Sequence, residues 1–266
     1  MTSAVVPLRD PNQVVMATAD TIDVAGRNLR NLWRTLQALI FATVQPVIFV
    51  LLFRYAFGGV IHVPGVAYVD FLMPGIFAQA VTFGAIGTAV GLSADLKSGL
   101  LTRFRTLPMA RIAVLGGRTL ADLARNVLVV AVMTGVGFAV GFRVHNGAAS
   151  LLAALGLVVV FAYSLSWVFV TLGLRVSDPE AAQAAGVPFM FLLVFTSDAF
   201  VPLRSMPGWL QAIGAHQPVT ALVNAERSLT LGGPAKSDVL TSLAWSAGIL
   251  LVFAALATRA YRHMDR

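Results

Sequence analysis

The stretch 95–111 reads DLKSGLLTRFRTLPMAR and is the densest group of charges in a chain that is otherwise strongly apolar. It holds one aspartate and four basic residues, and long uncharged runs flank it at 71–94 and 126–142. A charge at the centre of a bilayer costs at least ~2.5 kcal/mol, so this charged island belongs in water and its flanks belong in hydrocarbon. The pattern predicts a loop between two membrane spans.

The composition extends this prediction to the whole chain. Of its 266 residues, 58% are hydrophobic and 12% are charged, and the mean hydropathy is +0.81. A soluble domain has about 25% charged residues, so the composition predicts an integral membrane protein. The formal net charge of +7 is explained by the excess of Arg and Lys that orients membrane loops. Nucleic-acid binding is not expected, because no basic stretch is interleaved with exposed aromatic side chains.

Six stretches are long and apolar enough to be membrane spans, since about 20 apolar residues cross ~30 Å of hydrocarbon as a helix. Backbone groups in lipid must be paired within the segment, which favours helices throughout. The predicted fold class is an all-α integral membrane protein with six transmembrane helices, formed by residues 1–266 as a single domain. The spans are expected at about 36–57, 71–94, 120–142, 150–174, 181–200 and 239–260.

The distribution of basic residues predicts the orientation of these spans. With both termini in the cytoplasm, five of the nineteen Arg and Lys residues lie outside, namely Arg54, Arg143, Arg204, Arg227 and Lys236. The other fourteen lie inside, and an excess of basic residues in the inner loops is typical of membrane proteins. We therefore expect a multi-pass protein of the cell (plasma) membrane whose two termini are cytoplasmic.

The region 201–230 is expected to form a re-entrant helical hairpin between the fifth and sixth spans. Its uncharged part, 205–225, could be taken for a seventh span, but this would place the basic C-terminus outside. The same part contains helix-breaking residues, namely Pro207, Gly208, Gly214 and Pro218. A pair of short helices that dips into the outer leaflet fits better, with Trp209 at the outer interface, where aromatic rings partition favourably.

The segment 21–35 has the pattern of an N-terminal amphipathic interfacial helix. Apolar side chains recur at helical spacing on one side, and Arg27, Arg30 and Arg34 occupy the other. Such a helix would lie on the inner membrane surface with its arginines toward anionic lipid headgroups. A solvated helical lead-in to the first span remains the alternative.

Neither a nucleotide site nor a metal site is predicted. The octapeptide GLSADLKS at 91–98 resembles a phosphate-binding loop, but Leu96 stands where glycine must let the backbone wrap the phosphates. Cysteine is absent, and the four histidines, His62, His145, His216 and His263, show no pair at metal-ligand spacing. We expect no catalytic residue, no cofactor and no metal in this chain.

Ion-coupled carriers usually place an acidic or basic group within a span. No predicted span has an acid near its middle. Asp122 lies near the inner end of the third span, within about one turn of Arg118 and Arg125, and Asp198 lies near the outer end of the fifth. These two aspartates are the candidates for proton or sodium coupling. If neither of them couples transport to an ion gradient, the energy for transport must come from another source.

Two glycine pairs, Gly87 with Gly91 and Gly137 with Gly141, have the four-residue spacing that permits close helix approach. The spacing places both glycines of a pair on one helix face. Packing inside one chain and packing at a dimer seam both remain open.

Several ordered motifs resemble those of the permease subunits of type-2 ABC exporters, in particular the daunorubicin-resistance-like drug and lipid exporters. In chain order they are QP at 45–46, FGG at 57–59, FLMPG at 71–75, Gly99, LPMAR at 107–111, GR at 117–118, FVP at 200–202, MPGWL at 206–210, Pro218 and Arg227. Leu100-Leu101 departs from the Thr-Leu that is usual in the family, and Gln217 stands where asparagine is common.

The resemblance implies a six-helix half-transporter that pairs with a second permease, as a homodimer or a paralogous heterodimer. It also implies two copies of a separate ABC ATPase subunit, which would bind the ATP and Mg²⁺. The charged island would be the cytoplasmic coupling segment, 95–111, which docks to the ATPase through Gly99, Leu100, Arg103, Phe104, Leu107, Pro108 and Arg111. The residues implied at an outer re-entrant gate are Pro202, Pro207, Trp209, Leu210 and Pro218.

The residues of the coupling segment agree with a docking role. Leu100, Leu101, Phe104 and Leu107 add an apolar side to a basic segment, and a helix that touched only solvent would gain little from them. An interfacial helix held by lipid headgroups is the alternative.

The expected function is therefore that of a membrane permease subunit of an ATP-driven exporter for hydrophobic or amphiphilic compounds, such as a drug, an antibiotic or a lipid. An ion-coupled secondary carrier that works without an ATPase is the alternative. The substrate-binding residues and the identity of the cargo are not predicted by the sequence.

Overall fold

The computed structural model describes residues 36–59, 61, 63, 65–99, 111–176 and 178–263, and all of their regular elements are helical. The helices are α2 (Leu36–Leu52), α3 (Tyr68–Gly84), α4 (Ile86–Lys97), α6 (Arg111–Ala139), α7 (Gly147–Arg175), α8 (Pro179–Phe195), α9 (Gly208–Ala215), α10 (Pro218–Leu231) and α11 (Ala235–His263). A π-helical turn, η1 (Phe53–Phe57), extends α2, and a 3-10 turn, η2 (Leu203–Ser205), precedes α9. The expected interfacial helix, 21–35, lies outside the described residues.

Four helical segments of the described chain are long and apolar enough to cross a membrane: Tyr68–Lys97, Gly116–Ala139, Gly147–Arg175 and Ala235–Tyr261. Two apolar helices are shorter, Thr43–Ala56 and Pro179–Phe195. A 17-residue helix such as α8 is only about 25 Å long, which is less than the ~30 Å of a hydrocarbon core. The fold is that of an integral membrane protein. Each of the six expected ranges overlaps one of these apolar helical segments, of which four have the length of a membrane span.

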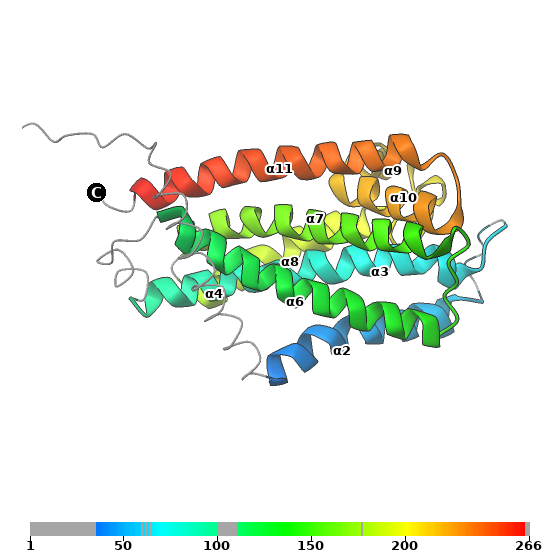
Figure 1. Cartoon of the computed structure of the whole chain (residues 1–266), viewed down its shortest axis with the longest axis horizontal. Coiled ribbons are helices and arrows are strands. Elements are labelled where there is room, and N and C mark those ends of the chain that lie inside the picture. Colours follow the sequence, from blue (N-terminus) through cyan, green and yellow to red (C-terminus); the bar gives the residue numbers. More distant parts are fainter. Residues whose placement is uncertain are drawn as a thin grey trace, which may run out of the picture.

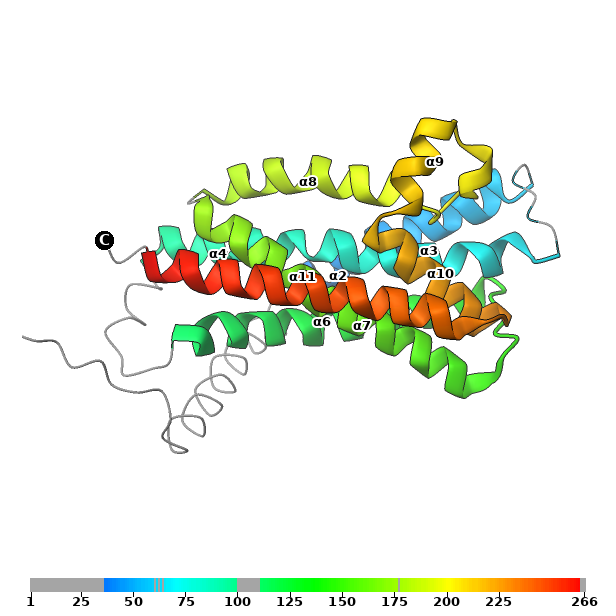
Figure 2. The ribbon, with the colours of Figure 1, turned by 90° about the horizontal axis from the view of Figure 1, so that it is seen from above.

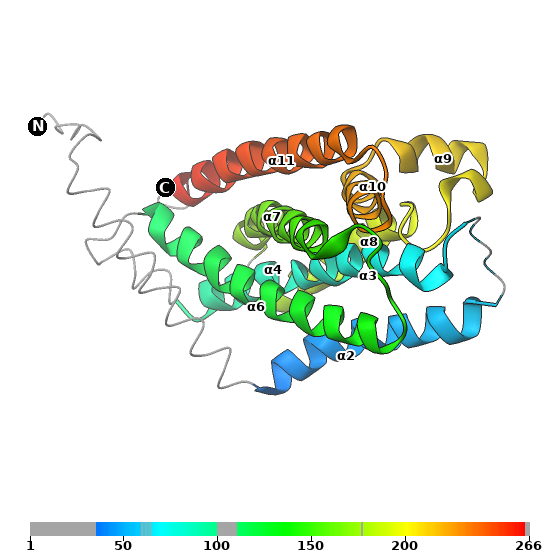
Figure 3. The same cartoon turned by 45° about the vertical axis from the view of Figure 1, so that its right-hand side comes forward.

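The long helices lie side by side in one bundle, with α9 and α10 at one end (Figure 1). Helix α7 is central and packs against α11, α4, α10 and α6. Figure 2 shows α8 on the side of the bundle away from α6, and Figure 3 shows α2 beside α6 on the side away from α11. The bundle therefore has α3 and α7 inside and the other long helices around them.

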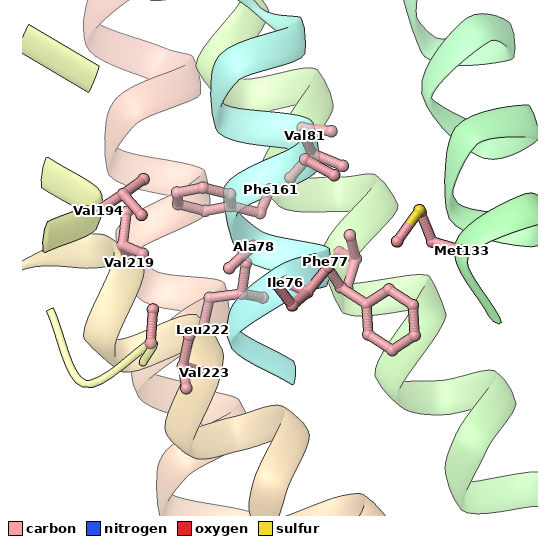
Figure 4. Packing of buried hydrophobic residues seen from close by; sticks show 14 of the residues in the cluster. Ile76, Phe77, Ala78, Val81, Met133, Phe161, Val194, Val219, Leu222 and Val223 are labelled. Atoms are coloured by element: carbon pink, nitrogen blue, oxygen red, sulfur yellow. The ribbon is translucent and has the colours of Figure 1, made fainter. Parts of the chain in front are cut away.

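Helix α3 supplies the centre of the core, because every residue from Tyr68 to Thr82 is buried. Figure 4 shows its side chains packed against several neighbours, with Ala78 beside Phe161 of α7 and with Val194 of α8 beside Val219 of α10. In Tyr68–Lys97 72% of the most apolar window is buried, whereas only 11% is buried in Ala235–Tyr261. Helix α11 thus presents an apolar outer surface, which suits contact with lipid tails.

The two ends of the bundle carry the two sets of loops that the charge pattern assigned to opposite membrane faces. At one end Arg54 Nε lies 3.5 Å from the carbonyl oxygen of Val140. At the same end the backbone N–H of His145 donates to the carbonyl oxygen of Thr230 at 2.8 Å. At the other end Lys97 of α4 forms an ion pair of 2.8 Å with Asp178, which caps α8. The hydrogen bond from Lys97 lowers the pKa of the exposed Asp178 carboxyl below its ordinary value. Below, the first is called the outer end and the second the inner end.

The predicted second span, 71–94, is two helices in the structure. Helix α3 ends at Gly84 and α4 starts at Ile86, with Ala85 in a turn between them. The other boundaries differ from the expected ones by a few residues, except that α6 begins nine residues earlier than expected, at Arg111. Charged residues of α6 are accommodated there by partners on α4, which a search for apolar runs cannot detect.

The sequence predicted a pair of short helices in 201–230, and the structure has two helices there, α9 and α10. Helix α9 begins just after Pro207, and Pro218 is the first residue of α10, a position where its missing N–H costs nothing. No single helix spans 205–225, and α9 ends at Ala215, one residue after Gly214. Gly214 lies within α9, where a Cβ would overlap the carbonyl oxygen of Thr196, so its role is close packing.

Candidate functional site

A cavity of about 650 Å³ opens between α2, α3, α4, α6 and α8, at the level of the break between α3 and α4. It is lined by Gln45, Pro46, Gln79, Ala80, Phe83, Gly84, Ile86, Gly87, Val90, Arg125, Asn126, Val129, Gln183, Val187 and Phe191. Most of these side chains are apolar, with a few polar groups among them. A cavity of this volume and character is typical of a site for a drug-sized molecule.

Two glycines make room for polar side chains of α6 in the cavity wall. A Cβ at Gly84 would lie 3.0 Å from Asn126 Oδ1, and one at Gly87 would lie 2.6 Å from Arg125 Nη1. Because α3 ends at Gly84, the carbonyl oxygen of that residue is free of a regular helix bond. Arg125 Nη2 donates to it at 2.5 Å. The helix break thus provides both the space and the acceptor that fix Arg125.

Four alternating charges, Asp95, Arg118, Asp122 and Arg125, form a row between α4 and α6 that we call the charge ladder. Arg118 Nη1 lies 2.6 Å from Asp95 Oδ2, and Asp122 lies 3.9 Å from Arg118 Nε and 3.8 Å from Arg125 Nη2. Thr88 Oγ1 also donates to Asp122 Oδ2 at 2.7 Å. The ladder runs from the inner end of α4 to the cavity wall.

The charge ladder changes the interpretation of Gly87 and Gly91. A Cβ at Gly91 would overlap Arg118 Nη2, so both glycines face guanidinium groups and not the backbone of another helix. The second pair behaves as expected at Gly137, where a Cβ would lie 2.7 Å from Met73 Cε across the α3–α6 contact. Sequence spacing cannot distinguish a glycine that packs against a neighbouring helix from one that makes room for an arginine side chain.

The two candidate coupling acids are both held by arginines. Asp122 is the centre of the charge ladder. Asp198 Oδ2 lies 2.7 Å from Arg227 Nη1. Each aspartate therefore has an arginine partner for its carboxylate in the structure.

Arg227 organises the outer end of the bundle. Its side chain is 9% exposed and lies over the Phe71 ring at 3.4 Å, and it donates to the carbonyl oxygens of Phe71, Asp198 and Ala199. Since carbonyl oxygens and a carboxylate surround it, the buried cation is well compensated. Arg227 joins α10 to the start of α3 and to the link after α8, the segment 196–202 that contains Asp198 and Ala199. The sequence motifs included Arg227, but its pairing with Asp198 was missed, because the two residues are 29 positions apart and Arg227 directly follows another acid, Glu226.

The structure describes all five residues of the expected outer gate. Pro202 precedes η2, Pro207 precedes α9, Trp209 and Leu210 lie in the first turn of α9, and Pro218 starts α10. Trp209 is 68% exposed, which suits a ring at a membrane interface. The glycine of the FLMPG motif also belongs to this end, because a Cβ at Gly75 would overlap the carbonyl oxygen of Ala199.

The expected ATPase-docking residues are described only in part. Gly99 follows α4 with φ of 70°, a left-handed conformation that favours glycine, and Arg111 is the first residue of α6. Leu100, Arg103, Phe104, Leu107 and Pro108 lie outside the described residues. The docking surface therefore stays a prediction, whereas its two anchoring helices are placed at the inner end.

A bundle of apolar helices that contains a largely apolar cavity with a few polar groups, and a charge ladder leading to that cavity, is typical of a membrane transport protein. The chain belongs to the ABC-2 type transporter family, whose model matches residues 23–231. This assignment confirms the resemblance that the sequence motifs indicated.

Two curated relatives are similar to this chain along most of its length. A daunorubicin resistance ABC transporter permease protein of Streptomyces coeruleorubidus is 36% identical over 244 residues, which cover 89% of this chain and 86% of the relative. A probable doxorubicin resistance ABC transporter permease protein of Mycobacterium tuberculosis is 29% identical over 255 residues, which cover 94% of this chain and 91% of the relative. The putative transport permease ycf38 of Pyropia yezoensis is 24% identical over 214 residues, or 76% of this chain and 71% of the relative.

Proposed function

We propose that this chain is the membrane-spanning subunit of an ATP-driven exporter that moves hydrophobic or amphiphilic compounds, such as drugs or lipids, out of the cell. Two copies of a separate ABC ATPase subunit, which bind ATP and Mg²⁺, supply the energy. A second permease, identical or paralogous, completes the membrane part. The family supports the ATPase partnership, and the relatives named for daunorubicin and doxorubicin resistance support a drug-like cargo.

The charge ladder is the observation that carries this proposal. It begins at Asp95, the first residue of the coupling segment 95–111, and it ends at Arg125 in the cavity wall. Since α4 ends at Lys97 and α6 starts at Arg111, an ATPase bound to 95–111 holds the ends of both ladder helices. Ion pairs that tie the two helices together let them move as one unit, so ATPase closure can reshape the cavity.

The topology that accompanies this function has six spans. They are α2 with η1, α3 with α4, α6, α7, α8 and α11, within a single domain that covers 1–266. The inner end faces the cytoplasm with both termini, and 21–35 lies along the inner leaflet. The region 201–230, with η2, α9 and α10, re-enters the outer leaflet and acts as the gate. The separation of basic loops between the two ends supports this orientation.

Reconstitution tests the function directly. The full chain and its cognate ATPase are placed in inside-out vesicles, and uptake of a fluorescent amphiphile is followed with ATP. We expect uptake with the intact ATPase and none with an ATPase variant that cannot hydrolyse ATP. Uptake without any ATPase, or uptake that an uncoupler abolishes at constant ATP, would support the ion-coupled carrier and contradict the exporter.

A further inference from the structure

The polar lining of the membrane cavity has an unusual balance of charge. Among the described residues that line it, Arg125 is the one charged side chain, and its other polar side chains are the amides of Gln45, Gln79, Asn126 and Gln183. No carboxylate belongs to this lining. Asp122, the acidic partner of Arg125, is outside this lining and also contacts Thr88 and Arg118. A bound molecule therefore meets a guanidinium and amides, without an anion.

Arg125 is well prepared to bind an oxygen-rich group. Its hydrogen bond to the Gly84 carbonyl and its pairing with Asp122 fix the side chain before any ligand arrives. A guanidinium has five N–H donors and stays charged in proteins, so donors remain after these contacts. Because the group is already oriented, a ligand does not bear the cost of ordering it.

Gln79 offers a second, independent sign of a polar ligand. It is 1% exposed, lines the cavity and has an Oε1 atom with no hydrogen-bond partner in the described part of the chain. Buried polar atoms are normally paired, so an unpaired amide beside a cavity indicates that a bound molecule or a water completes it. The amide can accept from a ligand hydroxyl, a group found in the same compounds that present acceptor oxygens to Arg125.

Apolar side chains line the same cavity, one helical turn from the polar groups of α3, α6 and α8. Phe83 of α3 and Phe191 of α8 meet edge to face, with ring centroids 5.1 Å apart, and Val90, Val129 and Val187 add to the same lining. Such walls take up a flat or branched apolar body. The cavity thus offers an amphiphile both polar groups and apolar surface.

We propose that this cavity binds amphiphiles whose polar end carries acceptor oxygens and no positive charge, in preference to cationic amphiphiles of the same size. The selection rests on Arg125, which attracts an anionic or oxygen-rich head and repels an ammonium group. This inference deepens the proposed function, because it names the substrate class of the exporter.

Three forms of one fluorescent compound test the preference. Daunorubicin has an amine that is cationic at neutral pH, its N-acetyl derivative is uncharged, and its N-succinyl derivative is anionic. The full chain is placed in nanodiscs of zwitterionic lipid, and binding is measured by fluorescence after subtraction of empty nanodiscs. We expect affinity to rise from the amine to the acetyl to the succinyl form, with roughly tenfold between the first and the last.

Two variants assign the preference to the cavity. Arg125→Gln is expected to remove most of the tenfold difference, whereas Arg259→Gln, the same change on the exposed face of α11, should leave it intact. Gln183→Glu places an acid in the α8 wall and should shift the preference toward the amine. A misfolded protein cannot produce such a reversal, so this variant protects the test against loss of structure.

Equal or tighter binding of the amine by the unmodified chain would overturn the proposal, and so would an unchanged preference in Arg125→Gln. Failure of all three compounds to bind would overturn it too. Binding here requires no ATPase. An intact order of affinity without ATP-driven uptake would count against the proposed exporter alone, while uptake that shows no charge preference would count against this inference alone.

Discussion

Asp122 lies in the middle of the charge ladder, where it contacts Thr88 and two arginines. It sits between two arginines of α6 and accepts from Thr88, so it pairs with Arg125 and shares Arg118 with Asp95. A buried ion pair adds little net stability over an apolar pair, but removal of one partner leaves an uncompensated charge. The charge ladder is therefore sensitive to single substitutions.

Asp122→Asn is expected to destabilise the bundle by roughly 3 kcal/mol, because Arg118 and Arg125 lose their shared partner. Thermal unfolding of the purified chain in nanodiscs measures the change. Glu180→Gln, at an exposed position of α8, removes one acid without touching the ladder and should have little effect. Equal stability of the two variants would show that Asp122 does not support the ladder.

At the scale of elements, the outer end depends on the close approach of α3 to the link after α8. Gly75 faces the carbonyl oxygen of Ala199, and Arg227 ties the same link to Phe71. Tyr68 Oη also donates to the carbonyl oxygen of Phe200 at 3.2 Å. The first turns of α3 thus position the chain that leads into the proposed gate.

Gly75→Ala is expected to lower the stability of the chain by about 1–3 kcal/mol, because the added methyl group overlaps a backbone carbonyl that cannot move independently. Gly135→Ala is the matched control, since nothing lies within 4 Å of a Cβ there. It should be neutral or stabilising by up to about 1 kcal/mol, from the higher helix propensity of alanine. The unfolding temperatures of both variants check this, and a tolerant Gly75 would contradict the packing described above.

The coupling segment is the second element with a specific expectation. Arg103→Glu should weaken co-purification of the cognate ATPase while insertion of the chain stays normal, because the docking surface would carry the opposite charge. Arg259→Glu makes the same change at the end of α11 and serves as the control. If the ATPase co-purifies equally with both variants, the docking role of 95–111 is wrong.

For the molecule as a whole, the orientation in the membrane can be measured by cysteine labelling, since the chain has no cysteine of its own. Trp209→Cys at the outer end should react with an impermeant maleimide on intact cells. Ser98→Cys at the inner end should react only after the membrane is opened. The unmodified chain provides the blank, and labelling of Ser98→Cys from outside would reverse the topology.

Much of the fold could be predicted because membrane helices obey a local rule. A run of apolar residues long enough to cross hydrocarbon must pair its own backbone, so the helices appear at the expected ranges. The rule does not give the ends of the helices or their interruptions. Helix α6 starts nine residues before the apolar run, and its Arg118 pairs with Asp95 of α4. The break at Ala85 could not be predicted, because no proline stands there.

The sequence by itself determined the membrane class, the helical ranges, the segregation of basic loops and the family. These follow from composition, spacing and ordered motifs, which are properties of neighbours in the chain. Only the tertiary structure decided that Gly87 and Gly91 face guanidiniums, that Asp198 pairs with Arg227, and that the lining of one cavity includes Arg125 and a set of amides. Those features join residues of different helices, and the packing of α3 against its neighbours is what brings them together.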